Sequence, residues 1–290
     1  MASIRDLRTR IRSVGSIKQI TRAMEMVATT KLRRFQDRAV ASRPYAKEIA
    51  QLLGRLADVL RERLADRPHF RPGEGQATAL LLVTSDRGLC GAYNSNLLAL
   101  LERWLAERPE RQVRFFVYGR RGYQYLRKRG RAVERYFVDP PLERVDYRVA
   151  KYTARALSEA FLAGGCREVV ILYTAFESMA RQVPTLLPLL PVEAAAGGDH
   201  GAQAAADVIL EPSAEVLLER LLPRYLETRV YNALLESITS EYAIRRVSMK
   251  NATDAASDMQ SILKGIYNRK RQEGITKELL DIVGGAEALR

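Results

Sequence analysis

Histidine and cysteine are scarce in this chain, with 2 of each in 290 residues. So few cysteines exclude a scaffold of several disulfide bonds and favour a reducing compartment, and so few ligands argue against a zinc site of the usual composition. The sequence also lacks an apolar run approaching 18 residues, so no transmembrane helix is expected. Charges interrupt the first 16 residues, so no secretory signal is expected there either. Hydrophobic residues make up 47% of the chain, which excludes a wholly disordered protein.

Positive charge is in excess, and it gathers at the two ends. The formal net charge is +13. Residues 1–47 hold 12 lysines and arginines against 3 acidic residues, and residues 245–290 hold 9 against 6, while the stretch between them is nearly balanced, at 26 against 25. This asymmetry indicates terminal segments that meet an acidic partner. A solvated basic face is the alternative interpretation.

The N-terminal 60 residues have the spacing of a long helix. Apolar residues recur there at steps of three and four: Ile4, Leu7, Ile11, Val14, Ile17, Ile20, Met24, Val27 or Ala28, Leu32, Phe35 and Ala39. This narrow stripe is typical of a coiled-coil seam. The run of threes from Ile11 to Ile20 departs from strict heptads and predicts a local change of supercoil. A bend is expected at Arg43-Pro44, because the residue before proline avoids helical geometry.

The C-terminal stretch, residues 213–290, has the same character. A helix of about 60 residues spans about 90 Å, whereas a compact globule of this chain length has a radius of gyration of only about 19 Å. The two helices must therefore project and pair with each other, or lie along a partner. Small residues at 252 and 255–257 either let the two axes approach closely or simply favour helix.

The middle of the chain, residues 75–211, predicts a Rossmann-like α/β domain. Short apolar runs predict strands at 78–84, 113–118, 168–174 and 206–210. Helical patterns lie between them, including a basic helix after Gly119 and a longer one between Glu143 and Ala163. This alternation favours a largely parallel sheet. Residues 67–76 are expected to form a linker, and residues 193–206 a mobile loop.

The sequence of this middle domain gives little indication of a catalytic or nucleotide-binding site. The loop after the first strand, residues 84–96, lacks the G-x-G-x-x-G and G-K-[ST] phosphate-binding patterns. Gly88 and Gly91 are better interpreted as turn glycines. Cys90 would need a neighbouring base to act as a nucleophile, and both histidines lie in expected linkers. No catalytic constellation and no cofactor site are therefore predicted.

Four separated blocks carry a family resemblance. They are I-K-Q-I-T-R-A-M-E-M-V-A-T-T-K-L at 17–32, T-S-D-R-G-L-C-G-A-Y-N-S-N at 84–96, M-K-N-A-T-D-A-A at 249–256, and Y-N-R-x-R-Q-x-x-I-T-x-E-L-x-x-I-V-x-G-A at 267–286. Together they resemble the gamma subunit of F-type ATP synthase, collinearly over essentially the whole chain. Length and the expected absence of a presequence favour the bacterial type.

The resemblance implies a non-catalytic rotor without cofactors. In that family residues corresponding to 1–60 and 213–290 form an antiparallel coiled coil, with an α/β domain beside it at 75–211. The coil turns inside a ring of three alpha and three beta subunits and couples proton translocation through the c ring to ATP synthesis or hydrolysis. Its foot contacts the epsilon subunit and the c ring, and the whole complex adds delta, a and b subunits. The expected location is peripheral, on the cytoplasmic face of the bacterial cell membrane.

The resemblance also implies contact residues. Met24, Lys31, Arg33, Arg34 and Arg245 are expected near the acidic lever segment of the beta subunit. Glu278 belongs to the tip that meets the catalytic collar, and Glu211 to the foot near epsilon and the c ring. Lys277 and Leu280 stand where the family usually has glutamine and threonine, so polar contacts of that tip are in question.

Two other interpretations stay open from the residues alone. The basic ends could bind nucleic acid through counterion release, although no recognised nucleic-acid module is present. The α/β domain could instead be a nucleotide-binding enzyme carrying helical arms. Retention on DNA would favour the first, and saturable binding of ATP or NAD the second.

Overall fold

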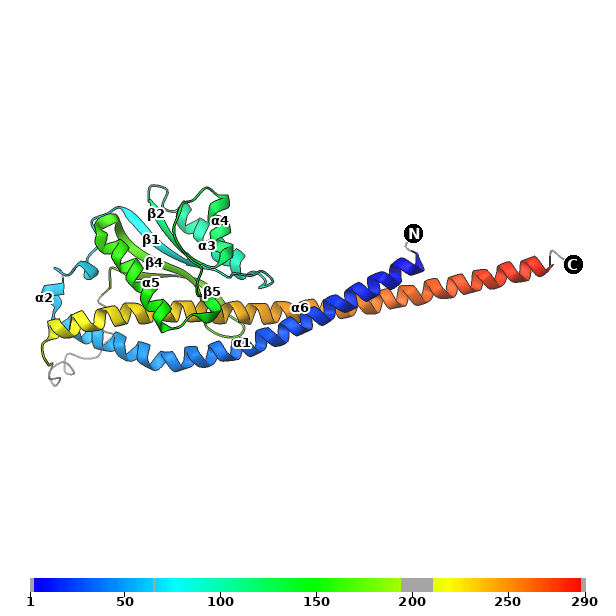
Figure 1. Cartoon of the computed structure of the whole chain (residues 1–290), viewed down its shortest axis with the longest axis horizontal. Helices are drawn as coiled ribbons and strands as arrows, with labels where there is room; N and C mark the ends of the chain where they lie inside the picture. The colour runs from blue at the N-terminus through cyan, green and yellow to red at the C-terminus, as the bar shows by residue number, and fades with distance from the viewer. Residues whose placement is uncertain (1–2, 65, 194–210, 288–290) are drawn as a thin grey trace. The chain divides into compact units, whose positions relative to one another are not determined.

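The computed structural model describes residues 3–64, 66–193 and 211–287, and it divides into two compact units. We call Met1–Thr30 with Arg245–Arg290 the terminal unit, and Lys31–Ile244 the central unit. Two long helices, α1 (Ile4–Val59) and α6 (Ala214–Glu287), contribute to both units (Figure 1). The other helical segments lie in the central unit: α2 (Arg61–Leu64), η1 (Pro68–Phe70), α3 (Tyr93–Ala106), α4 (Arg120–Lys128), η2 (Leu142–Arg144), α5 (Tyr147–Ala160) and the π-helical turn η3 (Phe161–Gly165).

The central unit contains a five-stranded sheet in the order β3-β2-β1-β4-β5. Its strands are β1 (Ala77–Val83), β2 (Val113–Tyr118), β3 (Val133–Phe137), β4 (Cys166–Phe176) and β5 (Gln182–Leu190). β1 runs parallel to both β2 and β4, and β2 runs parallel to β3, whereas β5 is antiparallel to β4. The expectation of a largely parallel, Rossmann-like sheet is therefore confirmed, with one antiparallel edge strand added.

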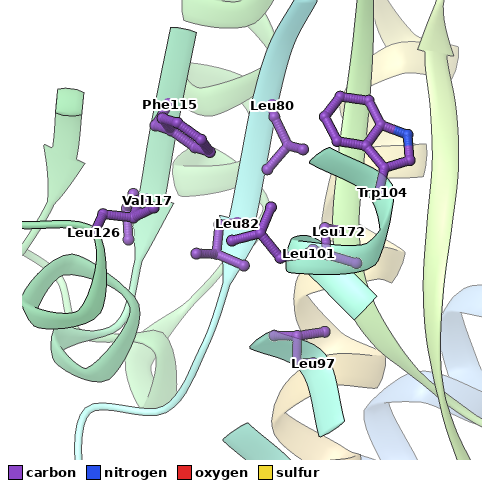
Figure 2. Close-up of a cluster of buried hydrophobic side chains, with 9 residues drawn as sticks. All are labelled: Leu80, Leu82, Leu97, Leu101, Trp104, Phe115, Val117, Leu126 and Leu172. Carbon is purple, nitrogen blue, oxygen red and sulfur yellow. The ribbon is translucent and has the colours of Figure 1, made fainter. Parts of the chain in front are cut away.

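The core of the central unit lies on both faces of β1, whose residues are buried along the whole strand. On one face, strand side chains meet α3 and α4 in a buried cluster, shown in Figure 2: Leu80, Leu82, Leu97, Leu101, Trp104, Phe115, Val117, Leu126 and Leu172. On the other face, the hydroxyl of Tyr118 on β2 lies 2.7 Å from that of Thr153 on α5. Helices thus cover both faces of the sheet, as parallel sheets require.

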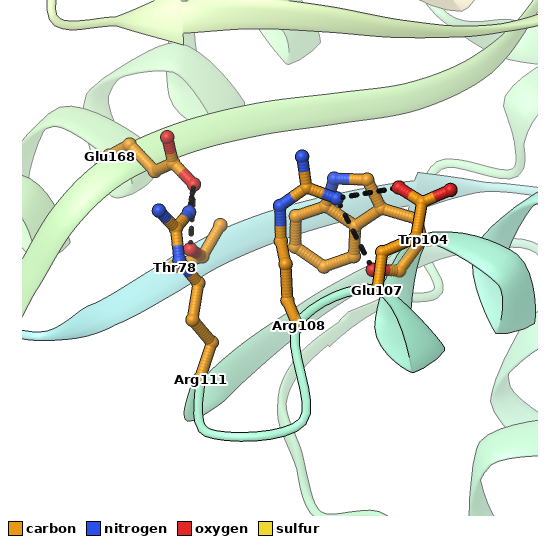
Figure 3. Close-up of polar contacts among 6 residues, drawn as sticks. All are labelled: Thr78, Trp104, Glu107, Arg108, Arg111 and Glu168. Atoms are coloured by element: carbon orange, nitrogen blue, oxygen red, sulfur yellow. Dashed lines mark hydrogen bonds and ion pairs between the residues drawn. The ribbon is translucent and has the colours of Figure 1, made fainter.

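Polar contacts fix the connection from α3 to β2 at the end of the sheet where β1 begins. The Glu168 carboxylate accepts hydrogen bonds from Arg111 and from the Thr78 hydroxyl, the latter at 2.9 Å (Figure 3). Arg108 donates to the Trp104 carbonyl at 3.4 Å and pairs with Glu107. The turn is therefore anchored both to β4 and to the preceding helix.

Three predicted strands are confirmed with small changes of boundary, and two others were missed. The runs at 78–84, 113–118 and 168–174 correspond to β1, β2 and β4, and the helix expected between 143 and 163 is α5. β3 and β5 had not been predicted. The strand expected at 206–210 lies outside the described residues, as does all but the first residue of the loop at 193–206.

The expected bend at Arg43-Pro44 does not interrupt α1, which continues through Pro44 to Val59. Proline removes the hydrogen bond to the carbonyl four residues earlier. Here both Val40 and Pro44 are exposed, so water can satisfy that carbonyl, while buried Ala39 and Ile49 hold the helix on either side.

The predicted linker at 67–76 is packed onto the central unit. The Gly73 amide donates to the Arg167 carbonyl at 2.9 Å, and the His69 carbonyl accepts from Val192 at 2.7 Å. A Cβ at Gly73 would lie 2.0 Å from the Cys166 carbonyl oxygen, so this close approach requires glycine.

Candidate functional site

In the terminal unit, α1 and α6 pair antiparallel through a seam that keeps strict heptad spacing. The buried and half-buried residues that follow this spacing are Leu7, Ile11, Val14, Lys18, Thr21, Glu25 and Ala28 on α1 and Met249, Thr253, Ala256, Gln260, Leu263, Tyr267, Lys270 and Gly274 on α6. Gly15, Met24, Ala252 and Ser257 are also half-buried and flank the seam. The Lys18 ammonium donates to the Ser257 hydroxyl at 2.9 Å, and the Thr253 hydroxyl donates to that of Thr21 at 2.8 Å. Steps of three and four alternate throughout, which is the pattern of a two-helix coil.

The prediction of a break in the heptads from Ile11 to Ile20 is therefore wrong. Ile17 is 52% exposed and Ile20 is 59% exposed, because the seam runs instead through the polar Lys18 and Thr21. The same reversal occurs on α6, where Ile262 is 64% exposed. Apolar side chains on the outside of the terminal unit are Ile4, Ile17, Ile20, Met26, Val27, Val247, Met259, Ile262, Ile266, Ile275, Leu279, Leu280 and Ile282.

This outward apolar set is the functional signal of the terminal unit, and the spacing analysis had placed two of its members, Ile17 and Ile20, in the seam. Soluble monomers rarely expose so many large apolar side chains on one element, and such surfaces mark interaction sites. The exposed apolar side chains therefore indicate that the terminal unit contacts a partner.

The terminal unit also carries a basic hollow of about 720 Å³ on the same helices. Its cationic residues are Arg8, Arg12, Lys18 and Arg22, and Gly15 lies at its floor, where a Cβ would meet the Gln260 amide nitrogen at 3.0 Å. The sequence analysis did not single out these four cations, although the excess charge of residues 1–47 pointed to the region. The hollow is suited to a carboxylate-bearing segment.

The sequence-predicted contact residues of the terminal unit occupy different environments. Met24 is half-buried, and Glu278 is exposed, as are Lys277 and Leu280. Arg245 is only 7% exposed, so its guanidinium is held within the protein rather than presented on a solvated face.

In the central unit, α1, α6 and η2 meet at a junction made by Lys31, Glu143 and Tyr242. The Lys31 ammonium lies 2.5 Å from the Glu143 carboxylate and 3.2 Å from the Tyr242 hydroxyl, which itself donates to Glu143. The Tyr242 ring also stacks on Phe35, with ring centroids 5.6 Å apart. Burial would raise the pKa of Glu143, but the hydrogen bonds from Lys31 and Tyr242 outweigh it and lower that pKa.

A second contact repeats this arrangement seven residues along α1. The Arg38 guanidinium donates to the Val145 carbonyl at 2.5 Å and to the Tyr231 hydroxyl at 3.1 Å. Residues seven apart share one helix face. Lys31 and Arg38 of α1 therefore each bind the η2 segment, and α6 supplies a tyrosine to each of the two contacts.

Arg33 and Arg34 differ from Lys31 in being exposed, and so does Glu211, which precedes α6. Glu211 belongs to the cis peptide Glu211-Pro212. These three side chains are accessible in the central unit, whereas Lys31 is engaged by Glu143.

Polar groups of the loop at 84–96 form hydrogen bonds with one another. The Ser85 amide donates to the Asn94 side chain at 3.1 Å, and Asn94 donates to the Ser85 hydroxyl at 2.7 Å and to the Cys90 sulfur at 3.3 Å. The Arg120 amide at the start of α4 donates to the Asp86 carboxylate at 3.0 Å. Two backbone amides near this loop, those of Ser85 and Arg120, are thus bound by side chains of the loop itself.

Two further observations concern only the described part of the chain. No group of three or more histidine, cysteine, aspartate or glutamate side chains is arranged to hold a metal ion there. No helix in those ranges combines the length and the apolar character needed to cross a bilayer.

Comparisons with known proteins place the chain in a family. A family model described as ATP synthase matches residues 3–289. The ATP synthase gamma chain of Chlorobium phaeobacteroides (strain DSM 266) is 38% identical, and that of Anaeromyxobacter sp. (strain Fw109-5) is 40% identical, each alignment covering 100% of both chains.

Solved structures agree on the fold. The Euglena gracilis mitochondrial ATP synthase rotor matches with a TM-score of 0.66 at 19% identity, covering 94% of this chain and 98% of that one. The central stalk of the Tetrahymena thermophila enzyme matches with a TM-score of 0.57 at 24% identity, covering 80% and 99%. From the full-length family match and these relatives, the chain belongs to the ATP synthase gamma chain family.

Proposed function

We propose that this protein is the central-stalk rotor of an F-type ATP synthase, turning inside an alpha3beta3 ring. Family membership supports the assignment, and the observation that carries it is the outward apolar set of the terminal unit. Side chains such as Ile17 and Ile262 gain from burial only if another protein encloses the helix pair. A ring that encloses the coil provides that environment on every side.

The basic hollow supports an electrostatic contact to the same ring. Arg8, Arg12, Lys18 and Arg22 would meet the acidic lever segment of the beta subunit, with Arg33 and Arg34 as further exposed contacts. Exposed charge pairs contribute only about 0–1 kcal/mol each, so they can exchange as the rotor turns. At each rotor angle, the conformational equilibrium of a catalytic site then shifts by the difference in rotor contact free energy between the two states of that site.

Of the predicted contacts, Met24 and Glu278 remain in this proposal, since both lie on the helices that would enter the ring. Lys31 and Arg245 take a different role in it. The Glu143 partner of Lys31 and the burial of Arg245 favour positions inside the rotor over direct contact with beta.

The subunit itself is proposed to be non-catalytic, since the loop at 84–96 lacks the G-x-G-x-x-G and G-K-[ST] patterns of nucleotide-phosphate sites. The exposed Glu211 would lie at the foot, facing epsilon and the c ring, through which proton translocation drives rotation. In this proposal the protein is peripheral, on the cytoplasmic face of the membrane. The names of the relatives give no support to the nucleic-acid alternative.

Co-expression with the cognate alpha and beta subunits tests the rotor assignment. The expected product has one copy of this chain per ring, with ATPase activity that depends on it. Ile17→Gln, Ile20→Gln and Ile262→Gln combined should reduce recovery of the complex at least tenfold. Val59→Gln, Val138→Gln and Leu162→Gln, which alter similarly exposed apolar residues of the central unit, should not. Equal effects of both triple variants, or no complex with the parent chain, would contradict the proposal.

A further inference from the structure

The basic helix α4 has no part in the rotor contacts above, yet one of its faces is built like a binding surface. Arg120, Tyr123, Gln124 and Arg127 follow the three- and four-residue spacing of a single helical face. With Lys128 and with Tyr136 of β3 they line a hollow of about 500 Å³ in the central unit. β3 is one of the two edge strands among the described strands, so the hollow lies beside an edge that pairs with no further strand there.

The cations of this hollow lack the acidic partners that their neighbours have. Arg129 and Arg131 share Glu102 at 3.0 and 2.7 Å, and Arg114 pairs with Glu134. Within the described ranges, by contrast, no carboxylate oxygen lies within 4.0 Å of a side-chain nitrogen of Arg120, Arg127 or Lys128. The Asp86 carboxylate accepts from the backbone amide of Arg120 at 3.0 Å.

The two tyrosines determine which anion the hollow suits. Their rings stack on each other with centroids 4.3 Å apart and planes 5° from parallel, and the Arg127 guanidinium lies over Tyr123 at 5.8 Å. A nucleobase needs an open aromatic face for stacking. Here each ring gives one face to the other and Arg127 lies over the Tyr123 ring, so guanidinium and ammonium N–H groups outnumber the aromatic faces left for a base. Such donors match carboxylates, which guanidinium groups can bind with two parallel hydrogen bonds.

We propose that this hollow on α4 and β3 docks an acidic, extended segment of a partner protein. Carboxylates of the segment pair with Arg120, Arg127 and Lys128, and its backbone runs beside the β3 edge. The absence of aliphatic side chains from the lining disfavours a membrane surface, which apolar anchors would have to enter. Charge complementarity selects this partner class and sets a salt-dependent affinity.

Fluorescence anisotropy of a labelled peptide of six Asp-Glu repeats provides the test. The peptide is titrated in 50 mM salt with the full-length chain carrying Arg8→Gln, Arg12→Gln and Arg22→Gln, which removes the other basic hollow from the comparison. Arg120→Gln, Arg127→Gln and Lys128→Gln combined should weaken the peptide affinity at least tenfold. The matched control, Lys47→Gln, Arg55→Gln and Arg220→Gln combined, removes the same charge from exposed positions elsewhere and should change it less than twofold. Far-ultraviolet circular dichroism should show that both variants remain folded.

Two additional probes separate the partner classes. A 12-nucleotide single-stranded DNA and vesicles containing anionic lipid are titrated under the same conditions. Weaker binding of both probes than of the peptide, together with loss confined to the α4 variant, supports the proposal. Equal losses in both variants would show that only total charge matters and would overturn it. Tighter, α4-dependent binding of DNA or vesicles would overturn the choice of an acidic protein segment.

Discussion

Replacing Glu143 by glutamine removes the charge opposite Lys31 while keeping a side chain of the same shape that can still accept from Tyr242. The Lys31 and Glu143 side chains are 37% and 38% exposed, so their pair is partly hydrated. A charge-assisted hydrogen bond contributes about 1.5–3 kcal/mol and an exposed ion pair about 0–1 kcal/mol. The partial exposure places Glu143→Gln between them, at a loss of about 1–2 kcal/mol in the free energy of unfolding of the central unit.

The pH dependence of this loss has a definite sign. Contacts with Lys31 and Tyr242 lower the pKa of Glu143 below its ordinary value of 4.5. A carboxylate whose pKa is lowered on folding stabilises the protein above its unfolded pKa, and that contribution disappears as pH falls through the folded value. The stability difference between the parent chain and Glu143→Gln should therefore stay constant from pH 8 to about 5 and shrink below about pH 4.5.

Tryptophan fluorescence during urea unfolding measures this effect, because Trp104 is the only tryptophan in the chain and lies buried in the central unit. Glu159→Gln is the matched control, since its partner Arg155 is exposed and one helical turn away. The control should lose about 0.5 kcal/mol or less. If Glu143→Gln behaves like Glu159→Gln, or if the difference grows in acid, the junction does not stabilise the fold as argued.

Three further changes have expected outcomes. Met24→Lys adds a cation on a helix proposed to enter the ring and should lower proton pumping per ATP hydrolysed in reconstituted vesicles; unchanged coupling would count against the Met24 contact. Ala28→Leu overpacks a seam position that is 0% exposed and should cost about 1–3 kcal/mol, measured by urea unfolding followed by circular dichroism at 222 nm. Leu80→Ala removes a fully buried side chain of the sheet core and should cost about 2–5 kcal/mol by Trp104 fluorescence; a loss below 1 kcal/mol in either core variant would contradict the packing described.

The sheet could be predicted from sequence wherever a strand is buried on both faces. β1, β2 and β4 have apolar runs that leave little choice of structure. β3 was missed because its Glu134 and Arg135 break the apolar pattern, and β5 because Pro184 and Pro188 argue against a strand. Both are edge strands, where exposed charges and prolines are tolerated.

The terminal helices show a different limit. Their existence and approximate length followed from spacing, and their antiparallel pairing was expected from the family resemblance. Hydrophobicity could not identify which stripe faces the neighbouring helix. Ile17 and Ile20 continue the apolar pattern of Val14, yet Lys18 and Thr21 occupy the seam. A residue selected for contact with another chain is as apolar as one selected for the interior, so a single sequence does not separate the two. The spacing of apolar residues also cannot predict contacts between distant parts of the chain, such as the one between Lys31 and Glu143.

The hydroxyl contact between Thr21 and Thr253 gives the helix pair a single axial setting. Sliding one helix by a heptad would bring Thr21 opposite Gln260 or Arg246 and would part Lys18 from Ser257. Polar groups inside a coil tolerate such mismatches poorly, whereas an all-leucine seam accepts them. Because a heptad step amounts to about 10 Å of helix, this lock defines how far the end of α6 reaches past Ile4, and so the length of the tip.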